Sequence, residues 1–174
     1  MNEQGMKTEG LIVGLLGAAA IALWFLIVDA VAGQPFFTPA MLGSALFWGS
    51  RDPAAVEISI QTVASYTMVH VLAFVVIGFL AAAMARQVER APSTIFIAIV
   101  FLIAVEFGFY IVLAILGPPL LGAFAWWSVA IGNAIAIAAM AFYLWRTHPH
   151  IRDHLARHPL GSSIDESSDS YEPL

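Results

Sequence analysis

Long apolar runs alternate with short polar segments along this chain, and one run is apolar almost throughout. Between Ile95 and Leu116 every residue is apolar or aromatic except Glu106 near the middle. About 20 apolar residues are enough for a helix to cross the roughly 30 Å of hydrocarbon in a bilayer. A carboxylate at that depth is costly, so we expect Glu106 to face protein or water rather than lipid.

Apolar runs of similar length recur, and they predict an all-α polytopic membrane protein with a bundle of four transmembrane helices. The expected spans cover about residues 10–32, 62–84, 93–116 and 122–144, within a transmembrane domain of residues 10–146. Residues 1–9 are then a short cytoplasmic N-terminus. Residues 147–174 form a cytoplasmic tail, first histidine-rich and then acidic, and we expect the acidic part to be disordered.

The longest connection, residues 33–61, contains an apolar stretch that is too short to cross a membrane. Thr38 followed by Pro39 is typical of a helix start, because threonine can cap the helix and proline suits its first position. Aromatic side chains at both ends of the stretch, Phe36 and Trp48, favour the headgroup region. We therefore predict a short interfacial helix between the first two spans, with a re-entrant segment as the alternative.

Composition agrees with a membrane protein. Of 174 residues, 60% are hydrophobic and 11% are charged, whereas soluble domains are about 45–50% apolar and about 25% charged. With the N-terminus inside, the outer segments hold only Arg51 as a basic residue. The inner segments hold Lys7, Arg86, Arg90, Arg146, Arg152 and Arg157. This imbalance predicts that both termini are cytoplasmic, in what we expect to be a bacterial inner membrane.

Several functional classes find no support in the sequence. The chain has no cysteine, so it cannot form a disulfide or a thiolate metal site of its own. No basic patch suits nucleic acid. No nucleophile elbow, P-loop or dinucleotide fingerprint is present. We therefore expect no enzyme activity and no cofactor. The expected partner is the lipid bilayer, together with other membrane proteins or further copies of the chain.

A few polar side chains fall inside the predicted spans at similar depths. At about 1.5 Å per residue, His70 lies roughly 12 Å, Glu106 roughly 15 Å and Asn133 roughly 16 Å from the outer end of its span. Asp29 lies only about 5 Å deep on the same scale. Spans two and three are joined by a short turn and should be antiparallel neighbours. His70 and Glu106 can therefore meet if their helix faces point together.

This intramembrane polar cluster has two interpretations. Its other members share helix faces with His70 or Glu106 and are Tyr66, Thr67 and Tyr110. The cluster can form a proton or ion relay running inward from Asp29 to the His70/Glu106 pair, as intramembrane carboxylates and imidazoles often do. It can equally be a buried polar pair that fixes helix packing. The inner halves of the spans offer almost no polar side chains, which counts against a complete relay.

Histidines suggest a third possibility, a haem or metal site. His70 is the sole histidine within the spans, whereas a haem with two axial histidines needs two. In the tail, His150, His154 and His158 recur every four residues and would share one helix face, as zinc ligands can. No catalytic zinc motif accompanies them. A metal there would be sensory or structural.

Small residues along the first and fourth spans favour close helix packing. They include Gly14, Gly17 and residues 18–20 in the first span and Gly132 in the fourth. This is more small-residue surface than one four-helix bundle needs. The sequence therefore favours a non-enzymatic accessory or structural subunit of a membrane assembly. The alternatives are a small proton- or ion-coupled transporter or channel, and a haem- or metal-binding membrane protein.

Overall fold

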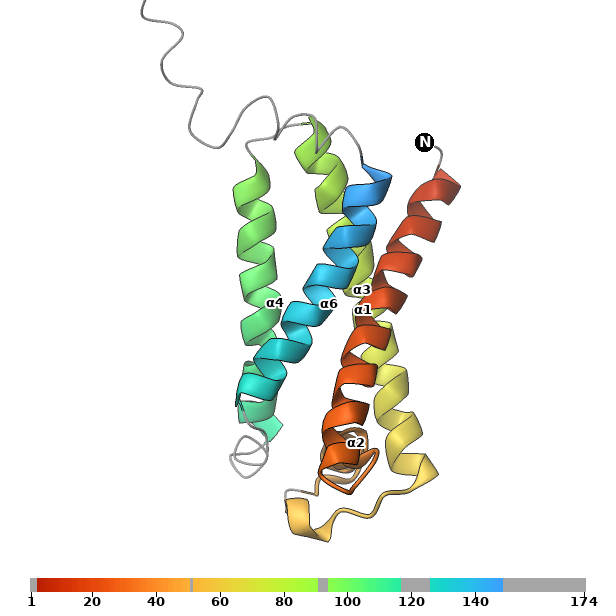
Figure 1. Ribbon diagram of the computed structural model, residues 1–174, viewed down its shortest axis with the longest axis vertical. Coiled ribbons are helices and arrows are strands. Elements are labelled where there is room, and N and C mark those ends of the chain that lie inside the picture. The colour runs from red at the N-terminus through yellow and green to blue at the C-terminus, as the bar shows by residue number, and fades with distance from the viewer. Residues whose placement is uncertain (1–2, 51, 91–93, 117–125, 149–174) are drawn as a thin grey trace, which may run out of the picture.

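The computed structural model describes residues 3–50, 52–90, 94–116 and 126–148, and this part of the chain is helical without strands. Its elements are α1 (Glu3–Val31), α2 (Phe37–Trp48), the 3-10 turn η1 (Pro53–Ala55), α3 (Ile60–Arg90), α4 (Ile95–Leu116) and α6 (Trp126–Thr147). The long helices run along the long axis of the molecule, and α2 lies at one end (Figure 1). The start of α1 and the ends of α3 and α6 gather at the opposite end (Figure 1).

Three helices in the described part of the chain are long and apolar enough to cross a membrane. They are Gly5–Val31 of α1, Ile60–Arg90 of α3 and Trp127–Thr147 of α6. This supports the predicted membrane class. In α4 the corresponding apolar stretch is shorter, Ile99–Val112. The four-span arrangement therefore stays a prediction.

The helices extend past the expected spans at the end opposite α2. α1 begins at Glu3, well before the apolar run that opens at Gly10. α3 continues to Arg90, through residues expected to form a polar connection. α6 runs on to Thr147. The extra turns carry polar side chains from three helices to one end of the bundle.

α1 packs most extensively against α3, and glycines allow the closest approach. A Cβ atom at Gly14 would lie 2.7 Å from the Cα of Val75 and against the carbonyl of Phe74. A Cβ atom at Gly78 would collide with the backbone of Gly10 and Gly14. The two backbones are therefore in direct contact, as the small-residue face of the first span predicted.

α6 packs on α1 around a tryptophan. The Nε1–H of Trp24 donates a hydrogen bond to the carbonyl of Ser128 over 2.7 Å. Gly132 lies beneath the indole, where a Cβ atom would come within 2.8 Å of the ring. The buried core beside this contact consists of Ile21, Phe25, Val129 and Ala136. α1 is thus the central helix, held by α3 and by α6.

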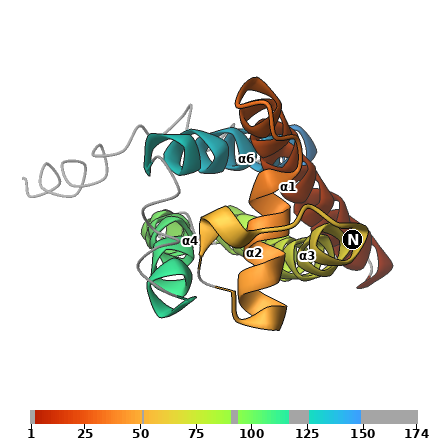
Figure 2. The same ribbon diagram turned by 90° about the horizontal axis from the view of Figure 1, so that it is seen from below.

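α2 runs across the end of the bundle, transverse to the long helices (Figure 2). Most of its side chains are buried, namely residue 38 and residues 40–45. It rests on the first turn of α3, where a Cβ atom at Gly43 would collide with the carbonyl of Thr62. Phe36 and Trp48, near its two ends, are exposed. An interfacial position for α2 fits this exposure and stays a prediction.

The start of α2 differs from the sequence-based expectation. The helix begins at Phe37, one residue before the predicted cap at Thr38. Its N-cap residue is Phe36, which has a left-handed backbone (φ 67°) and makes no side-chain capping hydrogen bond. The backbone N–H that needs a cap is bonded to a carboxylate from α1, because α1 supplies the acceptor that the local sequence lacks.

Candidate functional site

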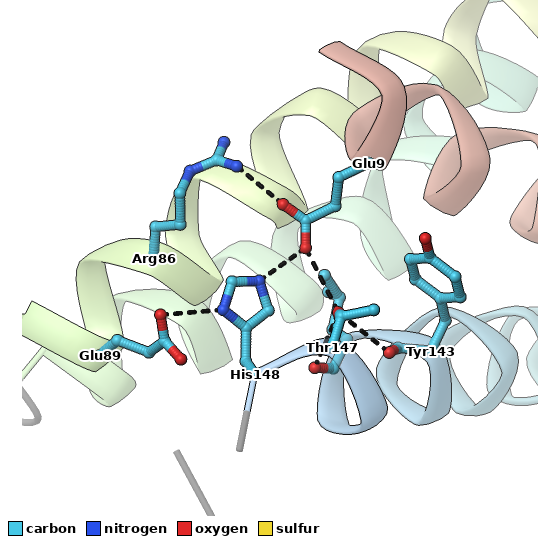
Figure 3. A network of polar contacts seen from close by, with 7 residues as sticks. Glu9, Arg86, Glu89, Tyr143, Thr147 and His148 are labelled. Carbon is cyan, nitrogen blue, oxygen red and sulfur yellow. Dashed lines mark hydrogen bonds and ion pairs between the residues drawn. The ribbon is translucent and has the colours of Figure 1, made fainter. Parts of the chain in front are cut away.

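Glu9 is the centre of a polar network that joins three helices at one end of the bundle. Its side chain, on α1, is buried. The Nη1 of Arg86, on α3, donates to Glu9 Oε2 over 2.8 Å. Glu9 Oε1 lies 2.6 Å from the Nε2 of His148 and accepts a hydrogen bond from Thr147 Oγ1 over 3.3 Å. The carboxylate therefore ties α1 to α3 and to the end of α6 (Figure 3).

The His148 ring lies between two carboxylates. While its Nε2 faces Glu9, its Nδ1 lies 2.9 Å from the Oε2 of Glu89 on α3 (Figure 3). Both ring nitrogens of His148 thus contact a carboxylate, and the ring links α1 to α3 at the end of α6.

At the other end of α1, Asp29 holds α2. Its carboxylate is buried and accepts two hydrogen bonds of 2.7 Å from Thr38, one from the backbone N–H and one from the hydroxyl. A carboxylate is favourable at a helix N-terminus because exposed N–H groups carry partial positive charge there. Asp29 therefore acts as the cap of α2. Both oxygens of Asp29 bond to Thr38. Its place in the predicted relay stays a prediction.

His70, on α3, faces α1. Its Nε2 lies 3.2 Å from the carbonyl oxygen of Ala18, so this nitrogen carries the proton and donates. The ring lies between Tyr66, with centroids 5.6 Å apart, and Phe74, with centroids 4.8 Å apart. The predicted neighbours His70 and Tyr66 are thus in contact. The imidazole bonds to the backbone of the central helix.

The remaining members of the predicted polar cluster are Thr67, Tyr110, Asn133 and Glu106. The hydroxyl of Thr67 donates to the carbonyl of Val63 in its own helix over 2.7 Å. Tyr110 packs beside the core between α1 and α6. Asn133 lines a cavity. Glu106 lies in α4, but its side chain is outside the described residues, so its pairing with His70 stays a prediction.

The predicted tail metal site falls on residues that the structure does not describe. His150, His154 and His158 all lie in the range 149–174. Within the described ranges, no three His, Cys, Asp or Glu side chains gather in a way that could hold a metal ion. The metal and haem alternatives therefore stay untested.

A largely apolar cavity of about 230 Å³ lies between α3, α4 and α6 and is partly open to the outside. Among its described lining residues, only Asn133 and the indole of Trp145 bring polar side-chain atoms. α4 makes few contacts with α3 and α6, which leaves this space between them. These described lining residues offer no pair of groups for proton transfer or nucleophilic attack.

Sequence reasoning missed the network around Glu9. The polarity of residues 1–9 and 86–92 predicts a terminus and a connection, and it does not indicate which of their side chains meet. One signal could have found it. In an antiparallel arrangement, Glu9, Arg86 and the end of the last span all come to the same side, and opposite charges there invite pairing.

Comparison with known proteins gives no match for this chain, neither to a family model nor to a curated protein nor to a solved structure. The functional argument therefore rests on the contacts described above.

Proposed function

We propose that this protein is a non-enzymatic accessory or structural subunit of a membrane assembly, with four membrane-spanning helices and both termini in the cytoplasm of a bacterium. The observation that carries this proposal is the use made of its buried polar groups. In the described part of the chain, every buried polar side-chain atom has a hydrogen-bonding partner. The main partners join one helix to another: Glu9 to Arg86 and His148, Asp29 to Thr38, and Trp24 to Ser128.

The arrangement of the helix ends supports a fourth span. α3 ends at Arg90, beside the network that also holds the end of α6. α6 therefore starts at the far end of the bundle. The chain between α3 and α6 has to travel the length of the bundle, and α4, with 22 residues, lies along that path (Figure 1). At about 1.5 Å per residue, α4 is about 33 Å long, enough for the hydrocarbon core.

The surface of α4 supports a partner in the plane of the membrane. Ile103 and Phe107 on this helix are 51% and 60% exposed, and α4 contributes little to packing within the chain. Helices in lipid associate through van der Waals packing, so an apolar helix that is loosely held by its own chain can pack against another protein.

Photo-crosslinking in native membranes tests the proposal. A photoreactive amino acid is placed at Ile103 or Phe107, and at buried Val13 as the matched control. We expect both α4 positions to capture the same membrane protein, and the mild-detergent extract to contain that protein in fixed ratio to this chain. Adducts to lipid alone, with a monomer in the extract, would overturn the proposal.

Proton flux separates this function from the transporter alternative. Purified protein in liposomes is challenged with a potassium diffusion potential, and internal pH is followed with a dye. We expect the same flux as in protein-free liposomes, for wild type and for Glu106→Gln and His70→Phe. A flux in wild type that Glu106→Gln removes would instead establish the relay, because the amide cannot carry a proton as the carboxylate does.

A further inference from the structure

The cavity between α3, α4 and α6 is long and follows the helix axes. Along α3 its lining runs from Phe74 to Val88, and along α6 from Asn133 to Trp145. At about 1.5 Å per residue these stretches measure roughly 21 Å and 18 Å. The cavity is therefore a slot about 20 Å long with a volume of about 230 Å³.

The slot suits a narrow occupant. The helices α3, α4 and α6 that border it still contact one another, whereas an α-helix with its side chains is about 10–12 Å across. A whole helix therefore does not pass between them. A narrow, unbranched and flexible apolar chain suits this space better.

The position of the slot matches one leaflet of a bilayer. It starts near the middle of α6 at Asn133 and reaches Trp145, three residues before His148 in the polar network. Half of a hydrocarbon core of about 30 Å is about 15 Å, close to the length of the slot. Trp145 at its outer end is a residue type that favours the headgroup level.

The lining also excludes water. Apart from Asn133 and the Trp145 indole, the described lining side chains are hydrocarbon or thioether, including Met84 and Met140. A water molecule in a cavity needs two to four polar partners, which this wall does not provide. Left empty, the walls would lose the dispersion contacts that packed atoms make. A partly open apolar slot between helices long enough to cross a membrane therefore favours lipid over water.

We propose that the slot binds one acyl chain of a membrane phospholipid from the leaflet on the side of Glu9 and His148. The acyl chain lies between α4 and the α3–α6 pair. Because α4 makes few direct contacts with these helices, the acyl chain supplies packing that the protein itself lacks there. The bound lipid is thus a structural component that fixes the position of α4.

Retention of lipid tests this inference. The protein is reconstituted with synthetic phosphatidylglycerol, extracted into mild detergent and measured by native mass spectrometry. Ala81 and Ala85 line the slot, so the double variant Ala81→Leu/Ala85→Leu fills it with side chains. Ala83→Leu and Ala138→Leu place the same side chain at exposed positions of α3 and α6 and serve as matched controls.

We expect one phosphatidylglycerol to remain on wild type and on both controls after the surrounding lipid has been removed, and at least a tenfold lower occupancy in the filled variant. Equal retention in all variants would overturn the inference, as would a wild type that retains no phospholipid or retains only detergent.

A second measurement keeps the test independent of the folding of that variant. Wild type and Trp145→Phe are titrated in detergent with phosphatidylglycerol that carries a brominated acyl chain. Subtracting the fluorescence of Trp145→Phe from that of wild type gives the emission of Trp145. We expect the brominated lipid to quench this emission and the quenching to saturate at one lipid per protein. Quenching that rises without saturation would contradict a defined slot.

Discussion

His148 and Glu9 stand 139 positions apart in the sequence, yet His148 Nε2 lies 2.6 Å from Glu9 Oε1. Since Glu9 also accepts from Arg86, this single carboxylate connects α1, α3 and the end of α6. Breaking one partner of a buried charged pair leaves the other uncompensated, with a penalty of about 3–5 kcal/mol. The end of the bundle is therefore held by charge, whereas its middle is held by backbone contact between glycines.

The glycine crossing between α1 and α3 predicts a sharp effect of one added methyl group. Gly78→Ala would push a Cβ atom against the backbone of Gly10 and Gly14, which cannot move aside as a side chain can. We expect a loss of about 1–3 kcal/mol in the free energy of unfolding, measured by SDS titration in mixed micelles.

Gly108→Ala is the matched control for that variant. It makes the same change on α4, where nothing lies within 4 Å of the added Cβ atom. Because alanine favours a helix over glycine by up to about 1 kcal/mol, Gly108→Ala should be neutral or stabilising. Equal effects of the two substitutions would contradict the direct backbone contact.

The contact between Asp29 and Thr38 predicts that α2 loosens when the carboxylate is removed. Asp29→Ala leaves two donors on Thr38 without their acceptor, at a cost of about 2–3 kcal/mol to the docking of α2. The chain has no cysteine, so Leu42→Cys on the buried side of α2 is a unique reporter. We expect its thiol labelling rate to rise at least tenfold in Asp29→Ala, since each 1.4 kcal/mol is a factor of ten.

Asp52→Ala controls for the loss of an aspartate cap. Asp52 accepts from the backbone N–H of Ala54 within one exposed turn and joins no two helices. Labelling of Leu42→Cys should stay at the wild-type rate in this background. A similar rise in both backgrounds would mean that α2 responds to surface charge and not to the contact with α1.

The sequence was sufficient for the features that depend on one helix at a time. Apolar length identified the membrane class and, among the four predicted spans, three helices that are long and apolar enough to cross a membrane. Small residues identified the face on which α1 meets α3 at Gly14. The position of Asp29 near the end of the first span was also clear. Its hydrogen-bonding partner Thr38 was not predictable from the sequence. Asp29 lies nine residues before Thr38, and the two meet only because the chain reverses direction between α1 and α2.

The pattern of apolar residues does not predict which side chains meet between helices. That pattern places His70 at a depth but does not say which neighbour it meets, and the ring bonds to the carbonyl of Ala18. Polar residues beyond the apolar runs predict connections between helices, and this pattern does not reveal the network of Glu9, Glu89 and His148. Such pairings depend on the rotation of each helix about its axis, which hydropathy does not fix.

The order of the helix ends predicts a labelling pattern for introduced cysteines. Lys7, Ala54 and Arg146 are exposed and lie near the start of α1, before α3 and at the end of α6. In intact cells we expect a membrane-impermeant maleimide to label Ala54→Cys. Lys7→Cys and Arg146→Cys should react only after permeabilisation. Labelling of Arg146→Cys together with Ala54→Cys would indicate three spans and contradict α4 as the fourth.

The central claim, that buried polar groups serve to hold the helices together, is tested most directly by a double-mutant cycle between Glu9 and His148. Unfolding free energies are measured in mixed micelles for wild type, Glu9→Gln, His148→Gln and the double variant. Because the side chains lie in one buried network, we predict a coupling energy of about 1–3 kcal/mol. Single effects that add to within about 0.5 kcal/mol would show that the two residues do not interact and would contradict the account.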